Sequence, residues 1–470
     1  MQKNVGVLLP VSALPGKHGI GDFGNEAFYF LSWLSKKGFK YWQILPLNPV
    51  GPAYSPYLTV CSKAIDSRYI SLDLLTQDGL LEPIPSFKAN TNKIEYDQVL
   101  KFKRKHLLFA YLTFIKRGKS KLARFIEDNK WVVDYAIYQI LKVKNKNKDW
   151  GLWPESDLKF FKNHQRIPKE YKEKINFEIF TQYIARKQWD ELFDFAHKNN
   201  IKIIADIPFY VGYDSVDCLE HKEEFLLDEH YKMTHVGGCP PDAFSDEGQL
   251  WGCPIYNFDK MKENNYSFLI DRISYVYGMC DILRLDHFRA FDTYYVIPNG
   301  MKNAKIGEWK IGPRMEFFKL LNKKTPGIDL IAEDLGDLVP SVYELKEETG
   351  LPGMFILQFA IFDRDRESDN NTIIYIGTHD NDTLAGWYKN LDVYGKTKLF
   401  DILDYPKDVY KAVIDYALKI PSKMVIFQLQ DLLLLDNRSR INCPGLIIDT
   451  NWTWKLKDFT ILKKCIYSPK

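Results

Sequence analysis

The stretch Asp281-Ile282-Leu283-Arg284-Leu285-Asp286-His287-Phe288-Arg289 decides how the rest of this 470-residue chain is interpreted. It begins as a short apolar strand and ends in a cluster of charged residues. Taking Arg284 and Asp286 out of water costs several kcal/mol per ion unless the two groups are paired or used. A structural ion pair is the simplest interpretation of an isolated Arg-x-Asp, so the remaining strands must show whether that interpretation is sufficient.

Composition sets limits on the class of protein. The chain is 46% hydrophobic and 27% charged, which is typical of a globular protein. A formal net charge of +3 is too close to neutral to indicate a nucleic acid or an anionic membrane surface as partner. No segment is long and apolar enough to span a bilayer. The apolar run at the start is interrupted by Pro10, and we interpret it as a first strand and not as a signal peptide.

The seven cysteines are scattered, odd in number and without a Cys-x-x-Cys pair. This distribution favours a reducing compartment over a disulfide framework or a zinc site. We therefore expect a cytoplasmic protein with no metal, no nucleic-acid partner and no membrane partner.

Strand and helix patterns alternate along the chain. Val5–Leu9 is predicted as a buried strand, Asn25–Lys37 as a helix and Tyr41–Leu45 as a second strand, which is the unit of a parallel sheet. Six further strands are predicted at Ile201–Asp206, Ile282–Asp286, Asp329–Glu333, Met354–Phe359, Thr372–Gly377 and Lys423–Leu429. Helices are predicted between them at Phe177–Asn199, Ser267–Gly278, Arg314–Leu321 and Val339–Glu348.

Eight strands with intervening helices predict an α/β protein, a (β/α)₈ TIM barrel forming one domain over residues 1–470. Large insertions are expected after strands 2 and 3. The first, at about 48–175, is partly helical, and the second, at about 208–264, is interpreted as a loop region near the active site. A doubly wound open sheet is the structural alternative, but it does not readily explain where the acidic residues fall.

Three predicted strands have acidic residues at or just after their carboxyl ends: Asp286, Glu333 and the pair His379-Asp380. In a (β/α)₈ barrel, the carboxyl ends of the strands converge on one mouth. Retaining glycoside cleavage needs a carboxylate nucleophile and a second carboxyl as acid/base, about 5–5.5 Å apart. Side chains such as His379 and Asp380 would hold sugar hydroxyls, through hydrogen bonds that strengthen in the transition state.

The two remaining acids are expected to differ in protonation. Arg284 should depress the pKa of Asp286 and keep this carboxylate ionised, as a nucleophile requires. Glu333 should have a raised pKa in a partly desolvated mouth, as an acid/base requires. The pattern therefore predicts an enzyme that cleaves glycosidic bonds.

The motifs around these residues resemble those of the amylomaltases, the 4-α-glucanotransferases or disproportionating enzymes of the α-amylase superfamily. The matches run in family order from about Gly6 to Trp454 and cover nearly the whole chain. They are Ser55-Pro56-Tyr57, Pro240-Pro241-Asp242-Ala243-Phe244-Ser245, Gly248-Gln249-Leu250-Trp251-Gly252, Arg284–Arg289, Ala332-Glu333-Asp334-Leu335-Gly336, Gly377–Thr383, Asn442-Cys443-Pro444-Gly445 and Asn451-Trp452-Thr453-Trp454.

The resemblance implies a retaining enzyme that cuts maltooligosaccharides and other α-1,4-glucans without a cofactor, and passes the fragment to the 4-hydroxyl of another sugar. It implies that Asp286 is the nucleophile, Glu333 the acid/base and Asp380 the transition-state stabiliser. For substrate binding, it implies roles for Tyr57 as a stacking ring, Arg284 and His379 at the cleaved residue, Asp206 in the polar floor, Asp242 and Trp251 on the acceptor side, and Asn442 from the C-terminal segment.

Simpler interpretations exist for the binding residues. Tyr57 and Trp251 could be packing aromatics, Asp206 could cap a turn, and Asp242 follows two prolines as turn residues often do. At the level of function, the alternatives are an α-1,4-glucan hydrolase and a catalytically silent glucan-binding protein. Pro52-Ala53-Tyr54 is shorter than the usual family segment and lacks its glycine and aspartate, so a second glucan-binding groove is not assigned.

Overall fold

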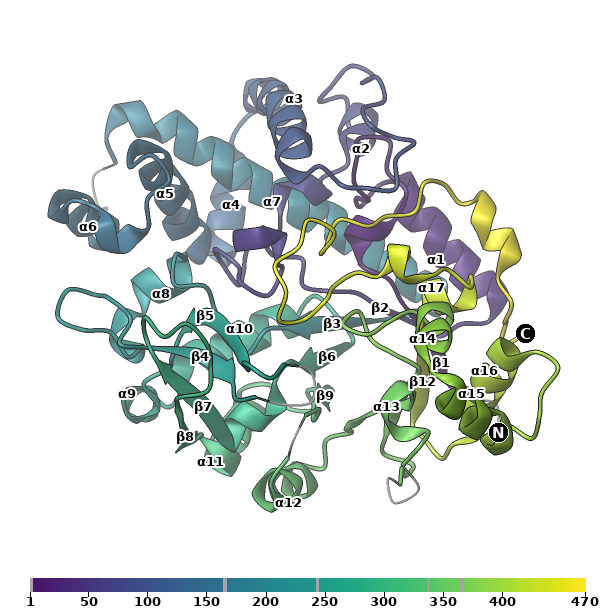
Figure 1. Cartoon of the computed structure of the whole chain (residues 1–470). Helices are drawn as coiled ribbons and strands as arrows, with labels where there is room; N and C mark the ends of the chain where they lie inside the picture. Colours follow the sequence, from purple (N-terminus) through teal and green to yellow (C-terminus); the bar gives the residue numbers. More distant parts are fainter. Residues whose placement is uncertain (1–2, 164–166, 242–244, 337, 364–366) are drawn as a thin grey trace.

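The computed structural model describes residues 3–163, 167–241, 245–336, 338–363 and 367–470. Its centre is a sheet of eight parallel strands in the order β10-β11-β12-β1-β2-β3-β6-β9. The first strand pairs with the second and also with the last, as expected for a closed barrel and not for a doubly wound sheet (Figure 1). The strands are β1 (Val5–Leu8), β2 (Tyr41–Gln43), β3 (Lys202–Ile207), β6 (Ile282–Leu285), β9 (Leu330–Ala332), β10 (Met354–Ile356), β11 (Ile373–Tyr375) and β12 (Met424–Gln428).

The seam between β9 and β10 is closed by a different set of contacts. The Ala332 N–H donates to the carbonyl of Pro352 at 2.9 Å. The carboxylate of Asp334 accepts the N–H of Met354 at 2.6 Å. Gly353 permits this approach, because a Cβ at this position would lie 2.3 Å from an Asp334 carboxylate oxygen. The predicted (β/α)₈ barrel is therefore confirmed, with a side chain completing its last seam.

Strand alternation explains how polar groups reach the mouth of the barrel. Successive side chains of a strand point to opposite faces, so residues two apart share a face. On three adjacent strands, an isoleucine of the barrel interior is followed two residues later by a charged side chain: Ile204 by Asp206, Ile282 by Arg284 and Ile331 by Glu333. The apolar layer therefore forms the floor on which the charged layer lies.

Helices surround the barrel. The first ends where Gly38 adopts φ 90°, a left-handed conformation that glycine reaches without steric cost. The predicted helix Asn25–Lys37 is confirmed with its bounds unchanged. The helices between and after the strands are α1 (Asn25–Lys37), α7 (Lys169–Lys198), α10 (Ser267–Tyr277), α11 (Arg314–Lys324), α12 (Pro340–Thr349), α13 (Leu357–Ala360), α14 (Leu384–Asn390), α15 (Val393–Ile402), α16 (Val409–Lys419) and α17 (Leu429–Leu432).

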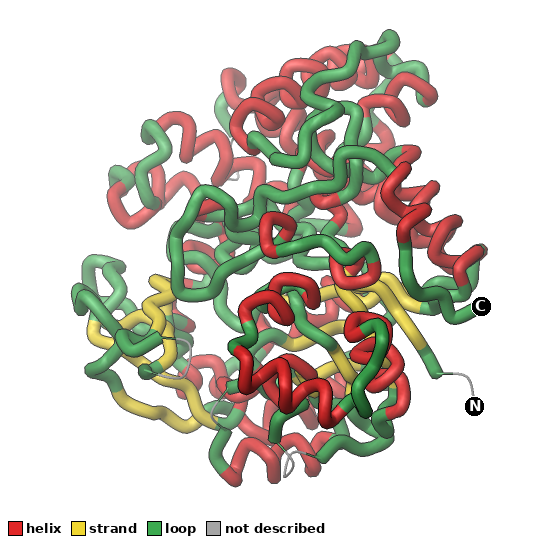
Figure 2. Tube along the Cα trace, turned by 45° about the vertical axis from the view of Figure 1, so that its right-hand side comes forward, coloured by secondary structure: helices red, strands yellow, loops and turns green. Residues whose placement is uncertain are grey.

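The segment between β2 and α7 is mainly helical and gathers on one side of the barrel (Figures 1 and 2). Lys103 connects helix α3 of this segment to the loops around it. Its buried ammonium donates to Asp22 at 2.7 Å and to the carbonyls of Arg68 and Ile70. The helices of this segment are α2 (Leu72–Gln77), α3 (Tyr96–Lys116), α4 (Ser120–Asp128), α5 (Trp131–Lys144) and α6 (Glu155–Lys162).

A four-stranded antiparallel sheet, in the order β5-β4-β7-β8, was not expected from the sequence. The interpretation of 208–264 as loops was wrong, because this region contains two of the strands. These two strands pair with each other, and β4 also pairs with β7, which follows β6, where no insertion was predicted. The β4–β7 pairing is a tertiary effect that local composition hides. The elements are α8 (Val216–Glu220), β4 (His235–Cys239), β5 (Gln249–Pro254), α9 (Phe258–Glu263), β7 (Thr293–Pro298) and β8 (Glu308–Ile311).

Two further features complete the fold. The predicted strand Met354–Phe359 is too long, since β10 ends at Ile356 and α13 begins at once.

After α17, an extended C-terminal segment crosses in front of the barrel mouth, yellow in Figure 1 and largely loop in Figure 2. Within the described parts of the chain, no helix combines the length and apolarity needed to cross a membrane.

Candidate active site

Arg284 joins two carboxylates at the carboxyl ends of β3 and β6. Its Nη1 lies 2.8 Å from both carboxylate oxygens of Asp206 and 2.9 Å from Oδ1 of Asp286. The β3–β6 register pairs Asp206 with Arg284 directly. The Arg284 side chain is 4% exposed and that of Asp206 is fully buried. A buried ion pair persists only with such close hydrogen bonding, so Arg284 and Asp206 form a rigid support for Asp286.

Glu333 is placed beside the Asp286 turn by backbone contacts. Its N–H donates to the carbonyl of Leu285 at 3.0 Å, continuing the β6–β9 ladder. The N–H of His287 donates to Oε2 of Glu333 at 2.7 Å. His287 adopts a left-handed conformation with φ 51°, which is uncommon for a non-glycine residue. Such strained positions cluster at functional sites, and this one aims a backbone donor at the Glu333 carboxyl.

The protonation of the two carboxyls differs from the expectation in one respect. Burial raises the pKa of Asp286 to about 7, although the Arg284 guanidinium opposes that rise. The expected depression of this pKa by Arg284 was therefore wrong, because desolvation outweighs the attraction of the cation. Burial also raises the pKa of Glu333 well above its ordinary value, and the charge of Asp286 adds to this effect. Of the two acids Asp286 and Glu333, Asp286 is the one that the Arg284 guanidinium hydrogen-bonds. A proton shared by these two acids therefore resides on Glu333.

Asp380 lies on the loop after β11 and is more open than the other two acids. Its side chain is 39% exposed. Oδ1 accepts from Nδ2 of Asn442 at 2.7 Å, and Oδ2 lies 3.4 Å from Nε2 of His379. The N–H of Asn442 donates to the carbonyl of His379 at 3.1 Å. The C-terminal segment thus reaches the mouth of the barrel at Asn442 and contacts Asp380 there.

Tyr57 connects the first insertion to the same cluster. Its hydroxyl donates to Oδ2 of Asp206 at 2.7 Å and lies 3.0 Å from Nε2 of His379. The Tyr57 and His379 rings are stacked, with centroids 5.4 Å apart and planes inclined by 11°. Trp452, for which the sequence predicted no role, adds a third ring 5.7 Å from Tyr57. The structure therefore brings Tyr57, Asp206 and His379 together around Arg284.

Trp251 lies on β5, beside the residue that follows Asp286. Its ring is 4.8 Å from that of His287 and nearly perpendicular to it. Burial lowers the pKa of His287 to about 4, so this imidazole is neutral beneath the indole. Asp242, predicted on the same lid, lies outside the described residues. The tip of the C-terminal segment meets β5 here, since a Cβ on Gly445 would lie 3.7 Å from Cγ of Gln249.

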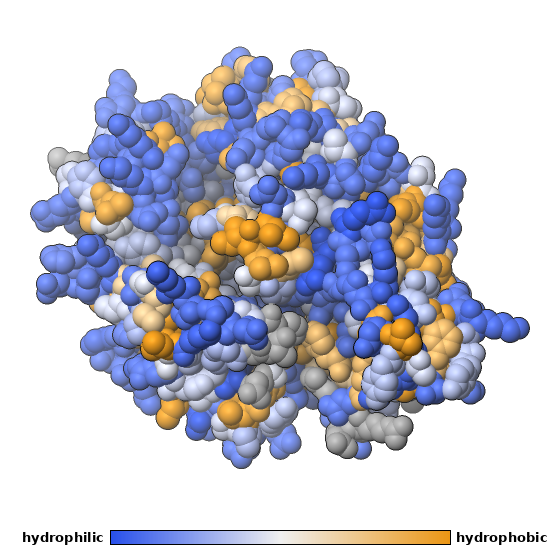
Figure 3. Space-filling view, viewed as in Figure 1, coloured by the Kyte–Doolittle hydropathy of each residue, from blue (hydrophilic) through white to orange (hydrophobic). Residues whose placement is uncertain are grey.

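The rim formed by this segment is apolar. Leu446 and Ile447 are exposed by 60% and 90%. Apolar atoms gather near the centre of the face shown in Figure 3, where the C-terminal segment crosses in Figure 1. The entrance thus combines an aliphatic edge with the charged interior described above.

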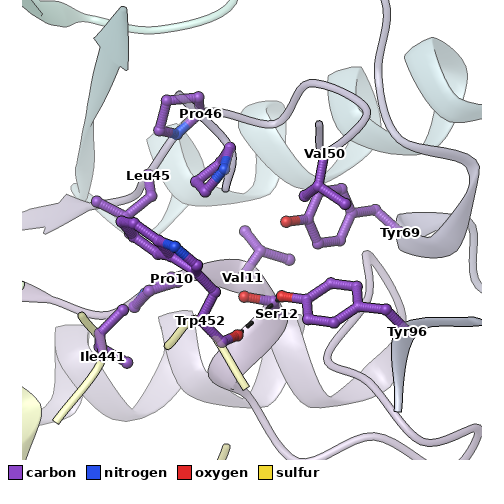
Figure 4. Close-up of a pocket in the computed structure, with 11 residues that line it drawn as sticks. Pro10, Val11, Ser12, Leu45, Pro46, Val50, Tyr69, Tyr96, Ile441 and Trp452 are labelled. Atoms are coloured by element: carbon purple, nitrogen blue, oxygen red, sulfur yellow. Dashed lines mark hydrogen bonds between the residues drawn. The ribbon is translucent and has the colours of Figure 1, made fainter. Parts of the chain in front are cut away.

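A small pocket behind the Tyr57 loop is separate from the acids. Figure 4 shows residues from the loop after β1, from the turn after β2 and from the C-terminal segment facing one another around it. Trp452 closes one side, and its carbonyl accepts the hydroxyl of Tyr96 at 2.9 Å. None of Asp286, Glu333 and Asp380 lines this pocket. Trp452 thus lines this pocket and also contacts the ring of Tyr57.

Arg440 is a site residue that sequence reasoning missed. It donates to the carbonyls of Asp380 and Asn442 and to the carboxylate of Asp382. The available signal was its place two residues before Asn442. Among the described residues, no group of three or more His, Cys, Asp or Glu side chains is placed to hold a metal ion.

Comparisons with known proteins identify the family of this chain. The sequence profile of one family, described as 4-alpha-glucanotransferase, matches residues 9–461. The 4-alpha-glucanotransferase of Clostridium butyricum is 39% identical over 466 residues, covering 95% of each chain. That of Streptococcus pneumoniae is 35% identical, covering 97% of this chain and 94% of its own. The structure of the amylomaltase from Streptococcus agalactiae in complex with acarbose superimposes with a TM-score of 0.92 at 33% identity, covering 98% of this chain and 97% of that one. The chain therefore belongs to the 4-α-glucanotransferases, the amylomaltases of glycoside hydrolase family 77.

Proposed function

We propose that Asp286, Glu333 and Asp380 carry out the glucan transfer of this enzyme by a retaining double displacement. The 4-α-glucanotransferase activity follows from family membership over nearly the whole chain. The assignment of roles is supported by one arrangement above all: Arg284 bridges Asp206 and Asp286 while Glu333 lies on the neighbouring strand. This arrangement separates a carboxylate held by a cation from a carboxyl that keeps a proton.

In the first half-reaction, the Asp286 carboxylate attacks C1 of the donor glucosyl residue. A bond forms between C1 and an Asp286 oxygen as the bond from C1 to the 4-oxygen of the next residue breaks. The proton of the Glu333 carboxyl passes to that 4-oxygen, so the shortened glucan leaves as a neutral alcohol. The other donor fragment remains on Asp286 as a glycosyl ester.

In the second half-reaction, the 4-hydroxyl of an acceptor glucan or glucose enters. The Glu333 carboxylate takes the hydroxyl proton, the acceptor oxygen bonds to C1, and the ester bond to Asp286 breaks. Two inversions at C1 give retention. Asp380 stabilises the oxocarbenium-like transition states of both steps through the hydroxyls of the reacting sugar, where hydrogen bonds strengthen as the ring flattens.

The remaining predicted residues would bind the glucan. Tyr57 offers a ring to the apolar face of the sugar, supported by the Arg284–Asp206 pair. Trp251 and Asp242 would cover the acceptor side, and His379 and Asn442 would hold the residue being cleaved. The substrates are maltooligosaccharides and α-1,4-glucans, for which the acarbose complex of the Streptococcus agalactiae amylomaltase gives support.

Two broader assignments are part of the proposal. The whole chain acts as one catalytic unit, with the segments 48–175 and 208–264 as insertions of the barrel. The enzyme works in the cytoplasm, for which buried free thiols at Cys61, Cys218 and Cys253 give support, because a reducing compartment keeps thiols unpaired.

The test of the proposal is the product distribution from maltotriose. A transferase yields glucose together with a ladder of longer maltodextrins. Maltose and glucose without longer products would instead identify an α-glucan hydrolase. Asp286→Asn should abolish turnover while a maltooligosaccharide still binds, as measured by calorimetry. Full activity in this variant would overturn the nucleophile assignment, and binding without turnover in the natural chain would identify a silent glucan-binding protein.

A further inference from the structure

Arg440 connects the two chain segments that carry Asp380 and Asn442. Its Nε donates to the carbonyl of Asn442 at 2.7 Å, its Nη2 to the carbonyl of Asp380 at 2.5 Å, and its Nη1 to the carboxylate of Asp382. The donors of a guanidinium lie in one rigid plane, so they fix three acceptors relative to one another. We propose that Arg440 is a positioning residue that holds Asp380 and Asn442 in the geometry required for glucan transfer.

Asp380 depends on such support more than the other two acids do. Arg284 holds Asp286, and a backbone N–H holds Glu333. The Asp380 carboxylate is more exposed, and its shortest contact is with the neutral amide of Asn442 at 2.7 Å. The orientation of Asp380 therefore depends on the position of Asn442. The carbonyl of Asn442 in turn accepts a hydrogen bond from Arg440.

Asp382 provides the fixed end of the connection. Its other carboxylate oxygen accepts from Nδ2 of Asn390 at 3.0 Å, and its carbonyl accepts from Nε2 of Gln358 at 2.8 Å. Both partners belong to helices beside the barrel, α14 and α13. Through Arg440, the position of the C-terminal segment is therefore fixed relative to helices that pack beside the barrel. A lysine carries its three donors on a single nitrogen, so it cannot reproduce the spacing of the three guanidinium nitrogens that reach these acceptors.

The fold of the C-terminal segment does not rest on Arg440 alone. The hydroxyl of Tyr96 donates to the carbonyl of Trp452, and the N–H of Ile94 donates to the carbonyl of Thr453 at 2.7 Å. Replacement of Arg440, whose side chain is 22% exposed, opens no large cavity in the core. The segment should stay docked in the variants while the register of Asn442 against Asp380 is lost.

The experiment compares Arg440→Met and Arg440→Lys with Arg438→Met. Arg438 is a matched control, since it lies two residues earlier, pairs with Asp436 and is 90% exposed. Steady-state kinetics of maltotriose disproportionation are measured with thermal unfolding of each variant. Arg440→Met should lower kcat by about 100-fold with little change in KM, because a small misplacement of a catalytic group acts on the transition state. Arg440→Lys should also lose kcat, and Arg438→Met should resemble the unmodified enzyme.

A double-mutant cycle with Asn442→Ala tests the route of the effect. If Arg440 acts through Asn442, the double variant loses no more kcat than the more damaged single variant. Additive losses would overturn the proposal, as would an Arg440→Met enzyme that keeps its kcat or loses only thermal stability. The proposal rests on the role of Asp380 given above, and Asp380→Asn checks that role separately. An active Asp380→Asn enzyme would remove the role of Asp380, whereas an active Arg440→Met enzyme removes only the role of Arg440.

Discussion

Tyr57 donates its hydroxyl hydrogen to Asp206 across a distance of 2.7 Å, although 149 residues separate them in the chain. A phenol hydroxyl has one hydrogen, and Tyr57 donates it to Asp206. In the hydrogen bond between the same oxygen and Nε2 of His379, at 3.0 Å, His379 must therefore be the donor. Burial lowers the pKa of His379, which favours the neutral ring. His379 is therefore the Nε2–H tautomer, and the hydrogen bonds run from His379 through Tyr57 to Asp206.

Replacing Tyr57 by phenylalanine tests this chain of hydrogen bonds. The ring that would stack on the sugar remains, while Asp206 loses a donor and His379 loses an acceptor. Loss of a hydrogen bond to a charged group costs about 1.5–3 kcal/mol, so kcat/KM for maltotriose should fall by about 10- to 100-fold. Tyr54→Phe is the control, because that hydroxyl contacts the exposed Asp97. Equal kinetics in both variants would show that the Tyr57 hydroxyl has no part in the site.

The pH dependence of kcat/KM should reveal the ionisation of Asp286. The nucleophile must be charged, so its raised pKa moves the loss of activity on the acidic side up to about pH 7. The charge of Asp206 contributes to this rise. Asp206→Asn should therefore shift the acidic limb to lower pH, even where the maximal rate falls. Asp73→Asn, a distant carboxylate paired with Lys17, is the control and should leave the limb in place.

We expect the alkaline limb of the same profile to belong to Glu333, because the proposed acid must carry a proton in the first half-reaction. Its pKa is raised well above the ordinary value by burial, so activity should persist above neutral pH and fall as this group ionises. Donors with a good leaving group need less protonation. Glu333→Gln should therefore lose most activity on maltotriose and less on an α-maltosyl fluoride donor. A variant equally impaired on both donors would contradict the assignment of Glu333 as acid.

Trp251 should affect acceptors more than donors, because it lies on the wall formed by β5 next to His287. Trp251→Ala would remove the aromatic contact that we propose for the acceptor, and stacking of this kind contributes about 1 kcal/mol. We expect a rise in the KM for glucose as acceptor and a larger share of hydrolysis, measured as the net gain of reducing ends, which transfer leaves unchanged. Tyr394→Ala, which alters an exposed ring on α15, serves as control. An unchanged acceptor KM would exclude Trp251 from the acceptor side.

Lys103 allows a prediction on stability that does not involve catalysis. Lys103→Met would leave Asp22 buried without its cation and two carbonyls without their donor. Breaking a buried ion pair costs about 3–5 kcal/mol of the free energy of unfolding. Urea denaturation should show this loss, with Lys105→Met, on the exposed face of α3, as the control. Similar midpoints for the two variants would contradict the structural role of Lys103.

The sequence alone determined the barrel and its acids. Strand and helix periods are local properties, and the carboxyl ends of barrel strands converge on one mouth, so Asp286, Glu333 and Asp380 could be predicted to meet there. The motifs around Asp286, Glu333 and Asp380 then indicated the family. These features depend on residues that are close together in the chain.

The tertiary structure decided what depends on long-range packing. The antiparallel sheet pairs β4 with β7, although the barrel strand β6 lies between them in the chain, and no local pattern encodes that pairing. The balance between burial and the Arg284 cation set the pKa of Asp286, and its outcome was the opposite of the expected one. The contacts of Arg440 with Asp380 and Asn442 are likewise set by the path of the C-terminal segment. Desolvation and register arise only when distant segments are packed together, which is why sequence periodicity could not supply them.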